Sequence, residues 1–172
     1  MNVYTNEMEE CAMRLEELID LYGDDILRLC LGYLGQRQLA EDAFQETFIK
    51  AWRAADSFRG QSSVKTWLSS IAVNTCRDML RSGWFRMQRR SEPIEMLLDL
   101  TAPEAEWIES PVRTAILNLP GKYREVILLY YDQGMTISEI ANLLRLSQNT
   151  VSTRLRRARK QLEEGLKGEI EL

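Results

Sequence analysis

The chain has 172 residues, of which 45% are hydrophobic and 28% are charged, and its formal net charge is −4. This composition is typical of a soluble globular protein and excludes an intrinsically disordered chain. Because the sequence contains no histidine, it lacks the usual base for serine or cysteine nucleophiles and the commonest metal ligand. We therefore expect a protein that is not an enzyme and that needs no metal or other cofactor.

The sequence also indicates where the protein works. Its longest apolar runs are far shorter than the ~20 residues of a membrane-spanning helix. The acidic N-terminus lacks the basic region and apolar core of a secretory signal. The three cysteines, Cys11, Cys30 and Cys76, are odd in number and widely spaced, which favours reduced, buried thiols over a disulfide framework. These features predict a cytoplasmic protein.

Charges are strongly segregated along the chain. Residues 1–49 carry 3 basic and 11 acidic groups, and residues 50–90 carry 9 basic and 2 acidic groups. Residues 91–110 carry 6 acidic groups and no basic group, and residues 111–172 carry 10 basic and 7 acidic groups. Because salt screens electrostatic fields beyond about 10 Å, the charge of each local block determines what it attracts more than the net charge of the chain does. The chain therefore has two basic segments among acidic ones.

Apolar residues recur at helical spacing, and strand signals are weak. The apolar stripes consist of Leu15, Leu18, Ile19, Tyr22, Ile26, Leu29 and Cys30; of Phe44, Phe48, Ala51, Trp52 and Ala55; of Val64, Leu68, Ile71 and Thr75; and of Ile116, Leu119, Val126, Ile127, Leu129 and Tyr130. We predict an all-α fold in which Gly83 ends the third stripe.

The predicted helices form two small domains, residues 1–90 and 111–172. Between them, residues 91–110 contain two of the four prolines and no cations, without a sustained helical stripe. This segment predicts an acidic linker, although an acidic composition is also explained by simple solvation.

The first basic block joins an aromatic loop to a polar helical face. Phe58 and Arg59 lie in a polar loop that contains a glycine, and Trp67 lies beside the polar face of the next helix. That face consists of Thr66, Ser70, Asn74, Arg77 and Arg81, within an arc of ~80°. Aromatic rings beside hydroxyls, an amide and guanidiniums suit unpaired bases. Core packing of the two aromatic rings and plain solvent exposure of the polar arc remain the alternatives.

The C-terminal segment has the pattern of a helix-turn-helix. Thr136 followed by Glu139 predicts a capping box for a helix that ends before Arg145 and Leu146, and Ser147 can cap the next helix. In that second helix the apolar positions share one face. They are Val151, Leu155, Ala158 and Leu162.

The opposite face of this second helix is polar and basic. Its members are Asn149, Thr153, Arg156, Arg157 and Lys160, within a segment that holds five cations in seven positions. Short polar side chains early in the helix reach base edges in DNA, while the cations around them contact phosphates. A solvated charged face is the alternative, but five neighbouring cations without an acid repel one another on a free helix. The pattern therefore favours DNA as the partner.

Four motifs in this order resemble a bacterial sigma factor of the extracytoplasmic-function type. They are AEDAFQETFIKAW, SFRGQSSVKTWLSSIAVN, LPGKYREVILLYY and TISEIANLLRLSQNTVSTRLRRAR, and the likeness runs from about Leu15 to Leu166. The resemblance implies a promoter-specificity subunit that binds core RNA polymerase and promoter DNA and has no small-molecule substrate. It also makes an anti-sigma factor, commonly membrane-bound in this family, a candidate partner.

The resemblance assigns roles to matching positions. Ser152 stands where the family often has a lysine, and the acidic linker resembles the segment that threads towards the polymerase active site. Taken with the residue patterns, the expected sites are Asp42, Gln45 and Glu46 for the polymerase clamp helices; Phe58, Arg59, Trp67, Ser70, Asn74 and Arg77 for the single-stranded −10 element; and Asn149, Ser152, Thr153, Arg156, Arg157 and Lys160 for the −35 element.

Two other classes of protein share part of this pattern. An ordinary two-domain regulator with a C-terminal helix-turn-helix reads only duplex DNA, and it has no need of an aromatic loop beside a hydroxyl and amide face. An RNA-binding or RNase-like enzyme is disfavoured because the sequence has no histidine. The sequence therefore favours a sigma factor that recognises the −35 and −10 elements and helps to open DNA.

Overall fold

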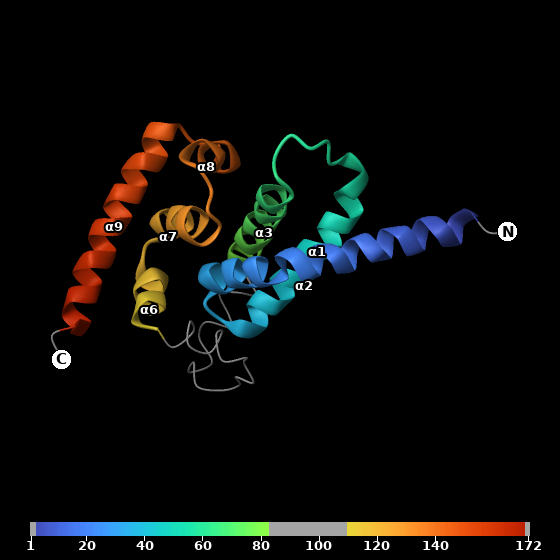
Figure 1. Ribbon diagram of the computed structural model, residues 1–172. Helices are drawn as coiled ribbons and strands as arrows, with labels where there is room; N and C mark the ends of the chain where they lie inside the picture. The colour runs from blue at the N-terminus through green and yellow to red at the C-terminus, as the bar shows by residue number, and fades with distance from the viewer. Residues whose placement is uncertain (1–2, 83–109, 171–172) are drawn as a thin grey trace.

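The computed structural model describes residues 3–82 and 110–170, and these residues form helices and connecting turns without a strand among them (Figure 1). The first domain contains α1 (Val3–Leu34), α2 (Arg37–Ala54), the short 3₁₀ helix η1 (Ala55–Ser57) and α3 (Val64–Arg81). The second contains α6 (Pro111–Asn118), α7 (Gly121–Ile127), the π-helical turn η2 (Leu128–Asp132), α8 (Ile137–Leu144) and α9 (Gln148–Ile170). The all-α fold predicted from the sequence is confirmed.

Local sequence signals account for the helix ends. Ser63 caps α3 by accepting a hydrogen bond from the Thr66 N–H. Ser110 caps α6 in the same way, and Pro111 follows at the first helical position, where its missing N–H has no helical partner to lose. Gly35 adopts φ +74° in the turn between α1 and α2, a left-handed conformation that favours glycine.

In the first domain, α1, α2 and α3 pack around a shared apolar core. Ile26 and Leu29 of α1, Phe48 of α2, and Leu68 and Val73 of α3 are all buried. Each of these helices therefore buries one stripe and leaves an opposite polar face exposed, as the periodicity predicts.

The structure corrects the assignment of Trp52 to the core and leaves three other predictions untested. Trp52 does not belong to the core, because 46% of its surface is exposed on the outer side of α2. Helix α3 ends at Arg81, with Ser82 as its C-cap, so Gly83 and the predicted linker up to residue 109 lie outside the described residues. Cys30 and Cys76 are buried free thiols as predicted, while the side chain of Cys11 is also outside the described part.

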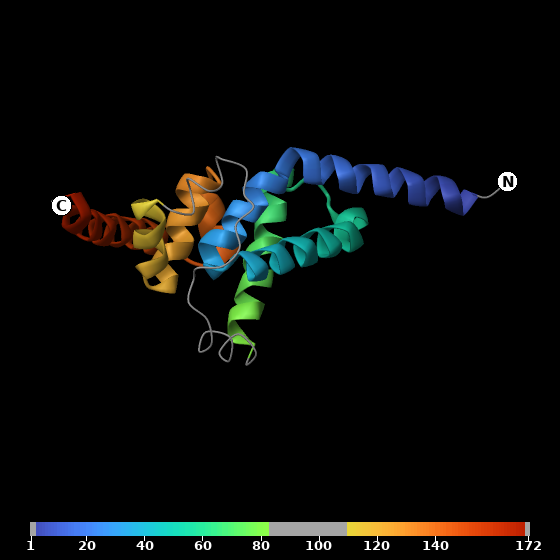
Figure 2. The same cartoon turned by 90° about the horizontal axis from the view of Figure 1, so that it is seen from below.

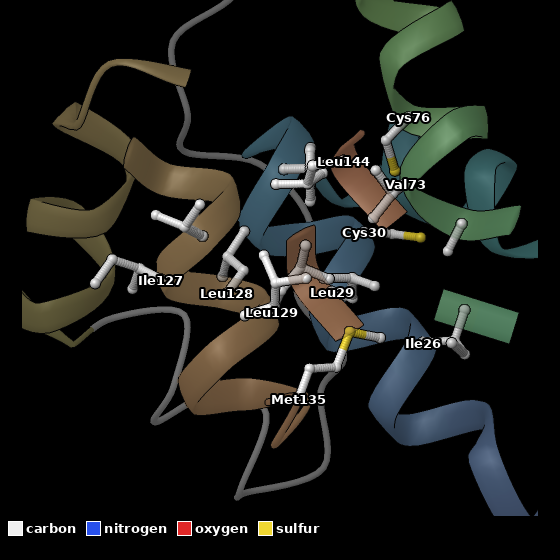
Figure 3. Packing of buried hydrophobic residues seen from close by; sticks show 14 of the residues in the cluster. Ile26, Leu29, Cys30, Val73, Cys76, Ile127, Leu128, Leu129, Met135 and Leu144 are labelled. Atoms are coloured by element: carbon white, nitrogen blue, oxygen red, sulfur yellow. The ribbon is translucent and has the colours of Figure 1, made fainter. Parts of the chain in front are cut away.

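The two domains pack directly against each other. Figures 1 and 2 both show α6 to α9 grouped beside the C-terminal half of α1, while the N-terminal half of α1 projects away. Leu128 and Leu129 of η2 and Met135 join Leu29 and Val73 of the first domain in one buried cluster (Figure 3). The core is therefore continuous across the two domains.

Candidate nucleic-acid and protein interfaces

The outer face of α2 carries the residues predicted to dock on polymerase. Asp42 and Gln45 are exposed, and Glu46 pairs with Lys50 at 3.5 Å along the same helix. The structure adds Ile49 to this face, with 42% of its surface exposed. With 3.6 residues per turn, these positions and the exposed Trp52 lie within an arc of about 120°.

We call the residues Asp42, Gln45, Glu46, Ile49 and Trp52 the α2 outer face. Two exposed apolar side chains next to an acid and an amide are typical of a protein-binding surface. Sequence reasoning missed Ile49, and it assigned Trp52 to the core because both residues fit an apolar helical spacing. Only the packing of α2 on α1 and α3 distinguishes the two faces.

The loop between η1 and α3 positions an aromatic pair. The rings of Phe58 and Trp67 lie 4.7 Å apart between centroids at an interplanar angle of 30°, and both side chains are half-buried. Arg59 next to them is exposed, and Gly60 has φ +66°, which allows the chain to turn back towards Ser63. The pair is therefore a partly exposed aromatic surface that is supported by the core through Trp67 and followed in the chain by a cation.

The polar face of α3 is divided between solvent and the second domain. Asn74 is exposed, while the Ser70 hydroxyl donates to the Trp67 carbonyl oxygen at 2.7 Å. Arg77 donates to Glu125 Oε2 of α7 at 2.7 Å, so its guanidinium is paired with the second domain. The sequence had no signal for this long-range ion pair.

The helix-turn-helix of the second domain has the predicted end signals. Thr136 accepts from the Glu139 N–H at 3.2 Å, and the Glu139 carboxylate accepts from the Thr136 N–H at 2.8 Å, which completes the capping box. Arg145 ends α8 in the left-handed region at φ 55°, and the Ser147 hydroxyl accepts from the Thr150 N–H at 3.1 Å at the start of α9. These bonds define the start of each helix, and the left-handed Arg145 marks the turn between them.

Helix α9 buries one face and exposes the other. Val151, Leu155 and Ala158 are buried, and Leu162 is partly buried, as predicted. Thr153 is half-buried, and the remaining residues predicted to contact the −35 element are exposed: Asn149, Ser152, Arg156, Arg157 and Lys160. The predicted DNA-contacting positions therefore share one accessible surface, which we call the α9 basic face.

The five cations of α9 between Arg154 and Lys160 fall into two groups. Arg154 pairs with Glu125 Oε1 at 3.3 Å, and Arg159 donates to the Tyr131 hydroxyl at 2.7 Å while lying over that ring. These two arginines are held by protein groups. The other three cations, on the α9 basic face, are exposed; among them Lys160 lies 3.9 Å from Glu164, and Arg157 lies close to the Tyr123 hydroxyl.

Glu125 is a buried carboxylate at the contact of the two domains. Only 10% of its side chain is exposed, and it accepts from Arg77 of α3 and Arg154 of α9. Burial raises the pKa of the neighbouring Tyr33 hydroxyl well above its ordinary range, and the charge of Glu125 adds to this shift. Two guanidiniums balance this carboxylate, which is what a buried charge requires.

In the described part of the chain, no helix has an apolar stretch long enough to cross a membrane.

Comparison with known proteins decides the family. Residues 18–86 match the model of Sigma-70 region 2, and residues 110–162 match that of Sigma-70 region 4. The chain is 32% identical to the ECF RNA polymerase sigma factor SigW of Bacillus subtilis over 164 residues, which cover 88% of each chain. It is also 32% identical to the RNA polymerase sigma-H factor of Pseudomonas aeruginosa, over 87% of this chain and 84% of the other.

The chain belongs to the ECF sigma factors. As such it is a promoter-recognition subunit of RNA polymerase and not an enzyme. The ordinary two-domain regulator is excluded, because the first domain matches Sigma-70 region 2.

Solved structures of sigma factors share this fold. The sigma factor RpoE, solved with the anti-sigma factor NepR from Bartonella quintana, has a TM-score of 0.73 and 23% identity, covering 88% of this sigma factor and 96% of that chain. CnrH, solved with the cytosolic domain of CnrY, has a TM-score of 0.67 and 27% identity, covering 90% of this sigma factor and 88% of that chain.

Proposed function

We propose that this sigma factor divides promoter recognition between two surfaces and docks on core RNA polymerase through a third. The first domain, residues 1–90, carries the α2 outer face for the polymerase and the aromatic loop with α3 for the −10 element. The second, residues 111–172, carries the α9 basic face for the −35 element. Residues 91–110 join the two.

The α9 basic face suits duplex DNA. Asn149 and Thr153 near the start of the helix present short polar groups, and Arg156 can bond a guanine edge in the major groove. Arg157 and Lys160 supply charge for phosphates. Arg157 also lies close enough to the Tyr123 hydroxyl to lower the pKa of that group, which gives its side chain a defined direction.

The loop and α3 suit unpaired bases. A base can stack on the exposed part of the Phe58 and Trp67 pair, and base–aromatic stacking contributes roughly 1–3 kcal/mol per base. Arg59 lies next to this pair, where it can neutralise a phosphate. The exposed amide of Asn74 has two donors and one acceptor for a base edge. The observation that carries this role is a supported aromatic pair on the same side of α3 as an exposed amide about two turns further along the helix, an arrangement that duplex reading does not need.

The α2 outer face suits the polymerase. Ile49 and Trp52 provide apolar area, and Asp42, Gln45 and Glu46 provide the polar rim. We also place the protein in the cytoplasm, where RNA polymerase works. An anti-sigma factor is a further proposed partner, because the similar sigma factor RpoE was solved with the anti-sigma factor NepR, and CnrH was solved with the cytosolic domain of CnrY.

A transcription assay on matched templates tests this division of labour. A promoter is first selected from a random library with core polymerase and the wild-type chain. Phe58→Ala and Asn74→Ala are then compared on the duplex promoter and on the same promoter with a mismatched bubble at the −10 element. We expect both variants to transcribe poorly from duplex and to recover on the bubble, whereas Lys160→Ala should gain no activity from the bubble. Equal activity of Phe58→Ala and wild type on duplex would remove the strand-opening role.

A further inference from the structure

A cation on one flank of α9 is held by two tyrosines of η2. Arg159 donates from Nε to the Tyr131 hydroxyl at 2.7 Å, and its Cζ atom lies 5.5 Å from the ring centroids of both Tyr130 and Tyr131. The two rings meet edge to face, with 5.0 Å between their centroids. One hydrogen bond and two cation–π contacts therefore give the guanidinium of Arg159 a defined direction.

This cluster lies at the surface of the second domain. Tyr131 is 59% exposed, and Arg159 is exposed as well. Core packing therefore does not account for the position of the Tyr131 ring. Both tyrosines belong to the π-helical turn Leu128–Asp132, and such turns are rare and occur frequently at functional sites. These features indicate a binding role for the pair of Tyr131 and Arg159.

The bond to Tyr131 leaves the charge of Arg159 uncompensated. A tyrosine hydroxyl is neutral at pH 7, whereas Arg154 is paired with a carboxylate. Glu163 lies one turn after Arg159 on α9, but it accepts from Lys167 at 2.7 Å. In the part of the chain that the structure describes, the terminal nitrogens of Arg159 and the hydroxyl proton of Tyr131 have no further partner. Both groups can therefore donate to an external anion.

Arg159 lies beside the residues of α9 that are proposed to read bases. At about 100° per residue, it lies about 60° from Arg156 on one side of the helix, and Arg157 lies about 100° from Arg156 on the other. Asn149 and Thr153 fall between these two arginines. A helix in the major groove has a phosphate backbone on each side, because the groove is about 12 Å wide. Arg159 and Arg157 are thus placed to meet opposite strands.

We propose that Tyr131 and Arg159 form a phosphate clamp on one flank of α9, in which Tyr131 is a positioning residue that aims the guanidinium at the DNA backbone. The inference rests on the proposed binding of the −35 duplex by the α9 basic face. The terminal nitrogens of Arg159 and the hydroxyl of Tyr131 donate to oxygens of the same phosphate. Because phosphate contacts carry no base information, the clamp fixes the register of α9 in the groove and adds affinity on every sequence.

Phosphate scanning in the holoenzyme tests the clamp directly. Duplexes that carry the −35 element are made with one phosphate at a time replaced by a neutral methylphosphonate, and binding is measured for wild type, Arg159→Ala and Arg157→Ala. At one or two adjacent positions of one strand, the replacement should weaken wild type about eightfold at ~0.1 M salt and cost Arg159→Ala nothing further. The positions that couple to Arg157 in this way should lie on the opposite strand.

Two results of this scan would overturn the inference. If no methylphosphonate position couples to Arg159, its guanidinium does not contact the backbone. If the positions that couple to Arg159 and to Arg157 lie on the same strand, the two arginines do not flank the groove.

Tyr131→Phe isolates the positioning role, because it removes the hydroxyl and keeps the ring. It should weaken binding of cognate and scrambled −35 duplexes alike by about three- to tenfold, with an unchanged salt slope because no charge is lost. Tyr130→Phe is the matched control, since its ring contacts the same guanidinium and its hydroxyl is not the acceptor of the Arg159 Nε. Equal losses in the two variants would overturn the positioning role of Tyr131.

A double-mutant cycle distinguishes positioning from a purely structural bond. Arg159→Lys keeps the charge and loses the planar fork, so it should bind more weakly with the wild-type salt slope. In this background Tyr131→Phe should cost less than about twofold, because the group that it positions is already absent. Fully additive losses would overturn the inference. So would a Tyr131→Phe variant that melts earlier and, at a temperature where it is folded, binds like wild type.

Lys160→Ala and Arg156→Ala separate the clamp from the proposed function on which it rests. If these two variants weaken binding while those of Arg159 and Tyr131 behave like wild type, the clamp alone fails. If none of these variants changes binding of the −35 duplex, the α9 basic face is not a DNA-binding surface and the proposed function fails with the clamp.

Discussion

Salt dependence tests which of the five cations of α9 between Arg154 and Lys160 can contact DNA phosphates. The structure leaves Arg156, Arg157 and Lys160 exposed, and it holds Arg154 on Glu125 and Arg159 on Tyr131. Each cation that neutralises a phosphate of duplex DNA contributes about −0.9 to the slope of log K against log salt. Replacing Lys160, whose side chain is 77% exposed, should therefore flatten the slope by about one unit.

The magnitude at a single salt concentration follows from the same slope. At ~0.1 M salt, one lost phosphate contact lowers affinity about eightfold, or about 1.2 kcal/mol, on every sequence alike. Arg154→Ala should leave the slope nearly unchanged, because its guanidinium, with 24% of its side chain exposed, is paired with the Glu125 carboxylate. Arg156→Ala should instead relax sequence preference, with a loss of about 1–3 kcal/mol confined to the cognate site.

Fluorescence anisotropy with −35 duplexes over a salt series measures these slopes for the full chain. A duplex with a scrambled −35 sequence serves as the control that separates base reading from phosphate contact. If Arg154→Ala flattened the slope as much as Lys160→Ala, the division into paired and exposed cations would be wrong. If all variants weakened cognate and scrambled duplexes equally, base reading by α9 would be wrong.

Three further predictions concern docking, backbone strain and pH. Ile49→Ala with Trp52→Ala should weaken binding to core polymerase at least tenfold in native gels, because central apolar anchors carry much of the binding energy of an interface. The same double variant should leave the thermal melt unchanged. Arg145→Gly should raise the free energy of unfolding by about 0.5–1 kcal/mol in denaturant titrations, because it relieves the left-handed backbone at φ 55°; a loss of stability would contradict this. Hydrogen bonds from the backbone N–H and hydroxyl of Thr136 lower the pKa of Glu139, so its stabilising effect is full above the ordinary glutamate pKa and disappears as pH falls through the lowered value. Glu139→Gln should thus melt below wild type at neutral pH and together with it in strong acid, and a constant difference would argue against the ionised capping box.

Much of the fold is predictable from the sequence because its determinants are local. The capping box of Thr136 and Glu139, the cap at Ser147 and the buried stripe of α9 all depend on residues within one or two helical turns. Such signals act before any tertiary contact forms. They were sufficient for the all-α fold and for the helix-turn-helix.

The contact between the domains was not predictable by the same reasoning. Arg77 and Glu125 are 48 positions apart, and Gln133 and Asp25 are 108 apart. No periodic pattern encodes pairs at such separations. The prediction that Trp52 belongs to the core was wrong for a related reason. Its spacing fits the buried stripe, and only the packing of α2 shows that its side chain faces outward.

The candidate site was predictable as a set of residue types but not as a set of available groups. Five cations in seven positions favoured DNA, yet two of them bond protein partners from other helices. Arg77 was likewise expected at single-stranded DNA, and in the free chain it pairs with Glu125. Which charges can meet a ligand depends on tertiary contacts, which sequence alone does not give.

Permanganate reactivity at a selected promoter tests the central claim most directly, because it reports unpaired thymines in the opened region. Holoenzyme containing the wild-type chain should make thymines near the −10 element reactive. Holoenzyme containing Phe58→Ala should form closed complexes normally and show a sharp loss of reactivity. Full reactivity with Phe58→Ala, at the rate and extent of the wild type, would contradict the account of how this sigma factor opens DNA.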